Sequence, residues 1–110
     1  MISKKTCVPC QGGIPPLNQE QINNYIKELD PHWNINQYKD IRKEYDFETY
    51  KEAILFVNNV AGLAEDEGHH PFIHINYKKV LIILYTHKIN GLHENDFIVA
   101  SKCDLLYSKG

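Results

Sequence analysis

Basic residues, glycine, proline and long apolar segments are all scarce in this sequence, and each scarcity excludes a class of protein. The 110 residues include 12 Lys and Arg against 14 Asp and Glu. No basic run is longer than Lys4-Lys5 or Lys78-Lys79, so binding of nucleic acid through a broad basic surface is not expected. No apolar segment is long enough to span a bilayer, and the N-terminus has no apolar signal region. We therefore expect a cytoplasmic protein that binds neither nucleic acid nor a membrane.

Cysteine is also rare, with three residues in the chain. Cys7-x-x-Cys10 has the spacing of a metal or redox pair, but a closed zinc site needs a second pair of ligands. A thioredoxin-like motif needs a strand before it and a helix after it, and neither is predicted here. We interpret residues 1–16, with their Gly-Gly and Pro-Pro pairs, as an N-terminal arm holding reduced cysteines, and Cys103 as a small core residue.

The remaining chain, residues 17–110, fits one compact domain with a modest core, so association between copies is plausible. Asn18 with Gln21 predicts a capped helix that ends at Asp30-Pro31. Two short alternating runs, 33–36 and 39–46, predict a hairpin with a polar turn. A long helix is predicted from about Phe47 to Glu67, capped by Asp46 and ended by Gly68.

Two strands, 72–77 and 79–87, should follow with a tight turn near Lys78, and a last helix should begin after Gly91 with His93 as its cap. The order α-β-β-α-β-β-α indicates an α+β fold, a four-stranded antiparallel sheet with helices packed on one face. The run 80–84 is apolar on both faces, so a partner is expected to cover the face that the helices leave open.

Histidine is what the sequence has in abundance: five of its six histidines fall between His69 and His93. Such a cluster indicates acid/base chemistry or a metal site. Glu65 precedes His69 by four residues, so the helix end can bring this carboxylate and imidazole to the same side. A hairpin centred near Lys78 would place His87 opposite residues 69–70, so that His69, His70 and His87 converge at one sheet edge. The remaining histidines, His32, His74 and His93, are better explained as capping or solvated residues.

These residues carry a resemblance. The pattern Glu65-x-x-x-His69-His70-Pro71, followed at matching spacing by Tyr77, His87 and Asp96, resembles the signature of the pterin-4a-carbinolamine dehydratases. The similarity extends over roughly Leu17 to Tyr107, and the Cys- and Gly-containing opening is similar to that of longer family members. The resemblance implies a lyase that dehydrates 4a-hydroxytetrahydropterin to quinonoid dihydropterin, in tetrahydrobiopterin recycling, without a metal or other cofactor. It also implies a homodimer or homotetramer.

The resemblance further implies roles for particular residues. His69, His70 and His87 would share the proton transfers, with His69 as base and His70 or His87 as acid. Glu65 and Asp96 would orient the imidazoles. Groups around Pro71, Thr86 and Lys88 would bind the pterin edge. Vertebrate-type members carry a Trp where this chain has Ile73, so we expect Trp33 or Tyr77 to supply the aromatic contact instead.

Two alternatives stay open at this point. The first is a metal-binding protein with Glu65, His69, His70 or His74, and His87 as ligands. The second is a regulatory module, since some members of the family assist a transcription factor or regulate hydroxylase production. Its contact surface would be the doubly apolar strand together with the helix from Asn95, and its partner another protein.

Overall fold

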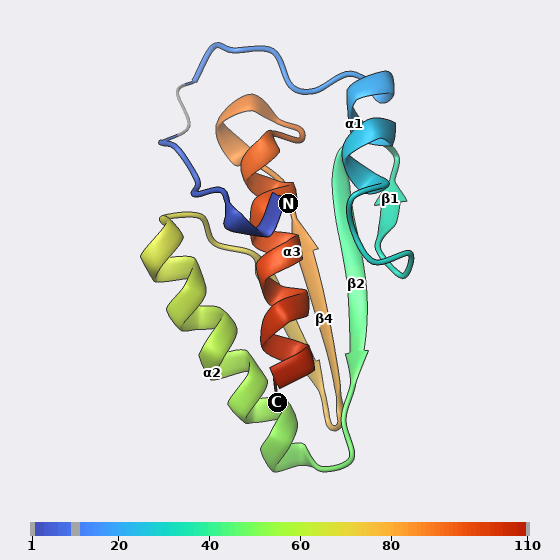
Figure 1. Cartoon of the computed structure of the whole chain (residues 1–110), viewed down its shortest axis with the longest axis vertical. Helices are drawn as coiled ribbons and strands as arrows, with labels where there is room; N and C mark the ends of the chain where they lie inside the picture. The colour runs from blue at the N-terminus through green and yellow to red at the C-terminus, as the bar shows by residue number, and fades with distance from the viewer. Residues whose placement is uncertain (1, 10–11, 110) are drawn as a thin grey trace.

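The computed structural model describes residues 2–9 and 12–109 and has the predicted α+β order (Figure 1). In chain order, its elements are η1 (Ile2–Lys4), α1 (Gln19–Ile26), β1 (Asn34–Asn36), β2 (Asp40–Asp46), α2 (Tyr50–Glu67), β3 (Phe72–Asn76), β4 (Lys79–Leu84), η2 (His87–Ile89) and α3 (Glu94–Lys109). The four strands form one antiparallel sheet in the order β1-β2-β4-β3. The fold class predicted from the sequence is thus confirmed.

Local capping signals explain where most helices begin and end. Asn18 and Gln21 form the predicted reciprocal capping box on α1. Gly68 adopts the left-handed conformation that ends α2, with φ of 65°. The Nδ1 atom of His93 accepts from the backbone N–H of Asn95 at 3.0 Å and so caps α3. His93 is therefore a capping residue, as expected.

The start of α2 differs from the prediction of an Asp46 cap. Thr49 is the N-cap, and its side chain accepts from the backbone N–H of Glu52. The chain stays extended through Phe47, whose N–H donates to the carbonyl of Lys78 at 2.9 Å. The Phe47 ring packs against Phe56 and Tyr107. This aromatic packing delays the helix by about one turn.

The strand predicted to reach His87 ends earlier, at Leu84. Beyond it, Thr86 and Gly91 form an isolated bridge, with the Thr86 N–H donating to the Gly91 carbonyl at 2.8 Å. The bridge closes a loop around η2, so His87 begins a 3-10 turn instead of ending a strand. Gly91 is needed where it stands, because a Cβ there would lie 2.7 Å from the Cβ of Pro16.

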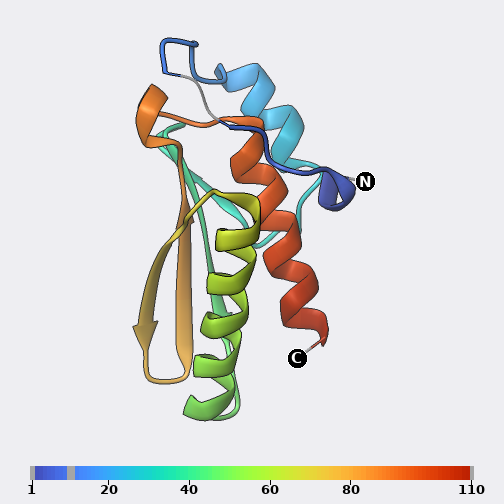
Figure 2. The same ribbon diagram turned by 90° about the vertical axis from the view of Figure 1, so that its left-hand side faces the viewer.

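Helices α2 and α3 lie on one side of the sheet, as seen in Figures 1 and 2. The covered face contributes fully or almost fully buried side chains from the two central strands: Ile41, Tyr45, Val80, Ile82 and Leu84. Alternation places Phe72, Leu81 and Ile83 on the opposite face, which no helix of the described residues covers. Phe72 is 55% exposed there. Within the described part of the chain, no helix has both the length and the apolar character needed to cross a membrane.

Candidate active site

The end of α2 and the end of β4 meet at one pocket. In the β3–β4 register, Phe72 pairs with Ile83 and Asn76 with Lys79. Continuing this register before β3 and beyond β4 brings residues 69–70 beside residues 85–86, whereas the prediction had placed His87 there. The pocket has a volume of about 390 Å³ and is lined by Val8, Pro9, Gly68, His69, His70, Tyr85, Thr86, His87, Lys88 and Asn95. The three predicted histidines therefore share one pocket.

His69 is held by a buried carboxylate. Its Nε2 lies 2.6 Å from Oδ1 of Asp96, which is fully buried. The other oxygen, Oδ2, accepts from the Thr86 hydroxyl at 2.8 Å and from the His93 N–H at 3.0 Å. Both donors come from the loop and cap that fold around the start of α3. The Asp96 carboxylate is thus oriented by two fixed donors and directs Oδ1 at the imidazole.

This arrangement selects one form of the His69 ring. A carboxylate oxygen accepts hydrogen bonds, so the proton between the two side chains belongs to Nε2 of His69. In the neutral ring the lone pair then stays on Nδ1. Since His69 also lines the pocket, it has the tautomer that a general base needs.

Glu65 pairs with His70 and not, as its spacing suggested, with His69. The Glu65 carboxylate and Nε2 of His70 are in direct hydrogen-bond contact, with side chains 76% and 62% exposed. The left-handed turn at Gly68 explains why Glu65 pairs with His70. It directs His69 inward to α3 and leaves His70 on the outer side with Glu65. The two adjacent histidines therefore have separate carboxylates, one exposed and one buried.

His87 is positioned by an aromatic neighbour. Its ring lies against that of Tyr85, with centroids 4.3 Å apart and planes inclined by 51°. Lys88 follows it on η2 and also lines the pocket, whereas Pro71 stands just after the lining residues. Of the residues expected to bind substrate, Thr86, Lys88 and the three histidines reach the pocket.

Trp33 and Tyr77 are not among the pocket's lining residues. Trp33 is 3% exposed, and its indole N–H donates to Oδ2 of Asp104 at 3.0 Å inside the core. Tyr77 lies in the β3–β4 turn with φ of 57° and stacks on Tyr50, at the opposite end of the hairpin. The phenol ring that lines the pocket belongs to Tyr85.

Sequence reasoning missed five lining residues: Val8, Pro9, Gly68, Tyr85 and Asn95. Tyr85 could have been predicted, because the β3–β4 register, continued beyond the strands, places it beside His70. Gly68 was noted only as a helix stop. Val8, Pro9 and Asn95 had no local signal, because the arm and the start of α3 are brought together by tertiary contacts alone.

The other histidines lie away from the pocket. His32 contacts the Asp30 carboxylate at 2.7 Å on an exposed loop, and His74 lies on the open face of β3. Residues 2–9 and 12–109 contain no group of three or more His, Cys, Asp or Glu side chains arranged to hold a metal. Cys10 lies outside the described residues, so the spacing noted for Cys7 and Cys10 remains an observation on the sequence.

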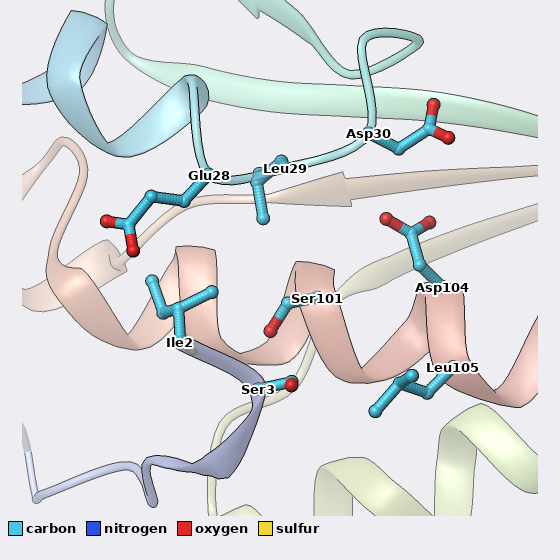
Figure 3. A pocket seen from close by; sticks show the side chains of 8 residues that line it. All are labelled: Ile2, Ser3, Glu28, Leu29, Asp30, Ser101, Asp104 and Leu105. Atoms are coloured by element: carbon cyan, nitrogen blue, oxygen red, sulfur yellow. The ribbon is translucent and has the colours of Figure 1, made fainter.

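A second pocket, of about 440 Å³, lies between η1, the end of α1 and the middle of α3. Figure 3 shows its side chains, which include the carboxylates of Asp30 and Asp104 but no imidazole. Lys43, which is 8% exposed, lies close to both carboxylates, with its Nζ 2.8 Å from Asp104 and 3.5 Å from Asp30. These carboxylates are engaged by a fixed cation, so we assign the chemistry to the histidine pocket.

Several known proteins are similar to this chain in sequence. The sequence profile of the family described as pterin 4 alpha carbinolamine dehydratase matches residues 15–106. A curated relative from Rickettsia canadensis is 41% identical over 104 residues, covering 94% of this chain and 95% of its own. Another, from Nitrosospira multiformis, is 45% identical over 106 residues, covering 96% and 92%. Both are provisionally named pterin-4-alpha-carbinolamine dehydratases.

Two solved structures are also similar. A protein from Brucella melitensis, described as a transcriptional coactivator/pterin dehydratase, superposes with a TM-score of 0.78 at 28% identity, covering 84% of this chain and 98% of that one. A pterin dehydratase-like protein, described as a RuBisCO assembly factor in the alpha-carboxysome, gives a TM-score of 0.59 at 25% identity, covering 68% and 88%.

Proposed function

Because the chain belongs to the pterin 4 alpha carbinolamine dehydratase family, we propose that it dehydrates a 4a-hydroxytetrahydropterin to the quinonoid dihydropterin. The observation that carries this proposal is the contact of His69 with the buried Asp96 carboxylate, at a pocket that His70 and His87 also line. A volume of about 390 Å³ lies within the range usual for small-molecule sites. The reaction would return the pterin cofactor to use after aromatic hydroxylation.

The reaction needs one proton delivered and one removed. The bond from the ring carbon to the hydroxyl oxygen breaks, and the leaving oxygen takes a proton to become water. The neighbouring ring nitrogen gives up its proton, so the overall proton count is unchanged. Imidazoles suit both transfers, because general acid/base catalysis works best when the catalytic group titrates near the working pH.

The contacts favour a division of these roles. His69 acts as the base, because the Asp96 carboxylate holds its proton on Nε2 and leaves the lone pair on Nδ1. The acid is His70 or His87, which line the same pocket. Asp96 orients His69 and Glu65 orients His70. Thr86, Lys88 and the backbone near Pro71 would bind the pterin edge, and the reaction would need no metal or other cofactor.

A stopped-flow assay of 4a-hydroxytetrahydropterin decay tests this function. His69→Ala should reduce kcat by about 10²–10⁴-fold, the usual contribution of one positioned acid/base group. His87→Ala should reduce it less if His70 is the acid and comparably if His87 is. His32→Ala is the matched control, because it removes an imidazole from an exposed loop away from the pocket. Activity that survives a chelator would support the metal-free chemistry.

Two results would end the proposal. One is a wild-type rate no faster than that in buffer. The other is a folded His69→Ala variant that works as fast as the wild type.

The open face of the sheet supports association into a homodimer or homotetramer. Phe72 is largely exposed, and Leu81 and Ile83 beside it are half-buried without a covering helix among the described residues. Contiguous apolar surface of this kind marks interaction sites. Light scattering of the wild type and of a Phe72→Glu, Ile83→Glu double variant measures the mass of the assembly. A wild type that is monomeric at high concentration would contradict this part of the proposal.

The same face favours a second candidate function, a regulatory or assembly module. The similar proteins described as a transcriptional coactivator and as a RuBisCO assembly factor indicate that this fold is compatible with such roles. A folded wild type that binds pterin but does not accelerate its dehydration would favour this reading. In that case the double variant of the open face should lose partner binding while His69→Ala retains it.

A further inference from the structure

The N-terminal arm reaches the histidine pocket from the far end of the chain. Val8 and Pro9 line the pocket together with the histidines. The arm passes the C-terminal end of α2 after η1 (Figure 1), where the Cys7 N–H donates to Oε1 of Glu67 at 2.8 Å. Ile2 anchors the beginning of the arm, since its side chain is 5% exposed and packs in the core.

Asn95 holds the arm with both ends of its amide. Its Oδ1 accepts from the Val8 N–H at 3.1 Å, and its Nδ2 donates to the Val8 carbonyl at 2.7 Å. These paired bonds imitate those between neighbouring strands. Asn95 is 2% exposed, so loss of the arm would leave a buried amide without partners unless water replaced them. Leaving such groups unpaired is unfavourable, which makes the docked arm part of the folded site.

The docked segment adds aliphatic surface to the pocket. The other side chains that line it are imidazoles, the Tyr85 phenol, a hydroxyl, an ammonium group and an amide. The Val8 side chain is 57% exposed, although both backbone groups of this residue are fixed. A flat heterocycle has apolar faces as well as polar edges, and contact with Val8 would remove both surfaces from water.

We propose that Val8 and Pro9 form the apolar wall of the substrate site, and that Asn95 is the positioning residue that holds this wall in place. The inference rests on the proposed function, because it takes the ligand to be a pterin. Asn95 directly precedes Asp96, so one turn of α3 holds both the wall and His69. The wall binds the ring of the substrate and takes no part in proton transfer.

The kinetic test separates binding from chemistry. Val8→Ala keeps every backbone hydrogen bond of the arm and removes only apolar surface. We expect KM to rise about 3- to 10-fold, the effect of losing one to two buried methyl-sized groups, while kcat changes less than twofold. Ile14→Ala is the matched control, because Ile14 is an exposed apolar residue of the arm outside the pocket. An unchanged KM in Val8→Ala would overturn the proposed wall.

Cys7 offers an independent readout of the docked arm. Burial and the nearby Glu67 carboxylate raise the pKa of the Cys7 thiol to about 12, so the docked thiol should react slowly with iodoacetamide. In a Cys10→Ser background, Asn95→Ala should accelerate alkylation of Cys7 at least tenfold, measured by mass spectrometry of the cleaved peptide. An unchanged alkylation rate in folded Asn95→Ala would refute the role of Asn95. If Asn95→Ala does not fold, Asn95→Asp provides the same test, because it loses the donor to Val8.

The same readout distinguishes failure of the wall from failure of the proposed reaction. Tetrahydrobiopterin, a pterin with no 4a-hydroxyl to lose, should slow alkylation of Cys7 by occupying the pocket beside the arm when it is kept under anaerobic conditions. Pterin protection of Cys7 in a protein without dehydratase activity would retain the wall and reject the reaction. Normal turnover with neither pterin protection nor a KM effect in Val8→Ala would retain the reaction and reject the wall.

Discussion

Helix α3 carries two aspartates, about two turns apart, that gather hydrogen bonds from distant segments, and the two have different consequences. Asp96 accepts from Thr86, from the His93 backbone and, through Oδ1, from His69. Asp104 accepts from Trp33 at 3.0 Å, from Lys43 at 2.8 Å and from Tyr45 at 2.6 Å. Asp104 joins α3 to strand β2, whereas Asp96 joins α3 to the segments that follow α2 and β4.

The two aspartates differ in whether the side chains that donate to them can change protonation. An indole N–H cannot ionise in water, and burial together with the neighbouring Cys103 and Asp104 raises the pKa of the Tyr45 hydroxyl far above its usual value. The Trp33 indole and the Tyr45 hydroxyl therefore keep their protons, and the cluster around Asp104 stabilises the fold. An imidazole can change its protonation near neutral pH. Under the proposed function, Asp96 takes part in catalysis and Asp104 does not, because one donor to Asp96 is a histidine at a pocket.

Of the substitutions that test this difference between the two aspartates, Asp96→Asn should have the largest effect on activity. The Thr86 hydroxyl and the His93 N–H donate to Oδ2, so the amide oxygen of the introduced asparagine would take that side and its NH₂ would face His69. His69 would then have to accept at Nε2, which moves its proton to Nδ1 and removes the base. We expect kcat to fall about 10²–10⁴-fold with little change in KM, measured by stopped flow. A variant with wild-type kcat would contradict the proposed tautomer.

Asp104→Asn should have the opposite profile. It weakens the partner of Lys43, a cation that is 8% exposed, so the free energy of unfolding should fall by about 2–3 kcal/mol. For a domain of this size that corresponds to a fall in Tm of roughly 8–15 °C. Denaturant and thermal unfolding followed by circular dichroism measure the loss, and kcat at room temperature should stay within twofold of the wild type. A large loss of kcat without loss of stability would remove the contrast between the two aspartates.

A smaller, pH-dependent effect is expected at Glu67, the carboxylate that holds the arm. Burial opposes ionisation, but the Cys7 N–H and the Lys102 ammonium outweigh it and lower the pKa of Glu67 below its usual value. A lowered pKa stabilises the docked arm above the usual carboxyl range, and this stabilisation is lost as the pH falls through the depressed value. Amide exchange of Cys7, compared with its intrinsic rate, should lose protection as the pH falls below the usual carboxyl range. Glu67→Gln should abolish this pH dependence, so that protection of the Cys7 amide no longer changes over the same pH range.

How far the sequence predicted the structure depended on the range of the interactions. The Asn18 capping box, the Gly68 helix stop and the His93 cap are set by neighbours within a few residues, and all were predicted. The convergence of the three histidines was predicted because a hairpin register needs only the position of its turn. The predicted start of α2 was wrong. Both Asp46 and Thr49 suit an N-cap, and the choice between them depends on packing of Phe47 against Tyr107.

Other parts of the site depended on contacts that no local pattern encodes. The pairing of Glu65 with His70 and not His69 follows from the direction of the chain after a left-handed residue. Trp33 was expected near the substrate, but its indole N–H found an acceptor in Asp104, far along the chain. The wall formed by Val8 and Pro9 required knowledge that Asn95 faces the arm.

The bond between Val8 and Asn95 joins residues 87 positions apart in a chain of 110. Synthesis proceeds from the N-terminus, so Val8 is made well before Asn95, and the pocket cannot close until α3 has formed and the arm has docked on it. Bringing together residues so far apart in sequence costs loop-closure entropy, so contacts of this range tend to form slowly. In a newly made chain, the capacity to hold a ligand would thus follow the formation of α3.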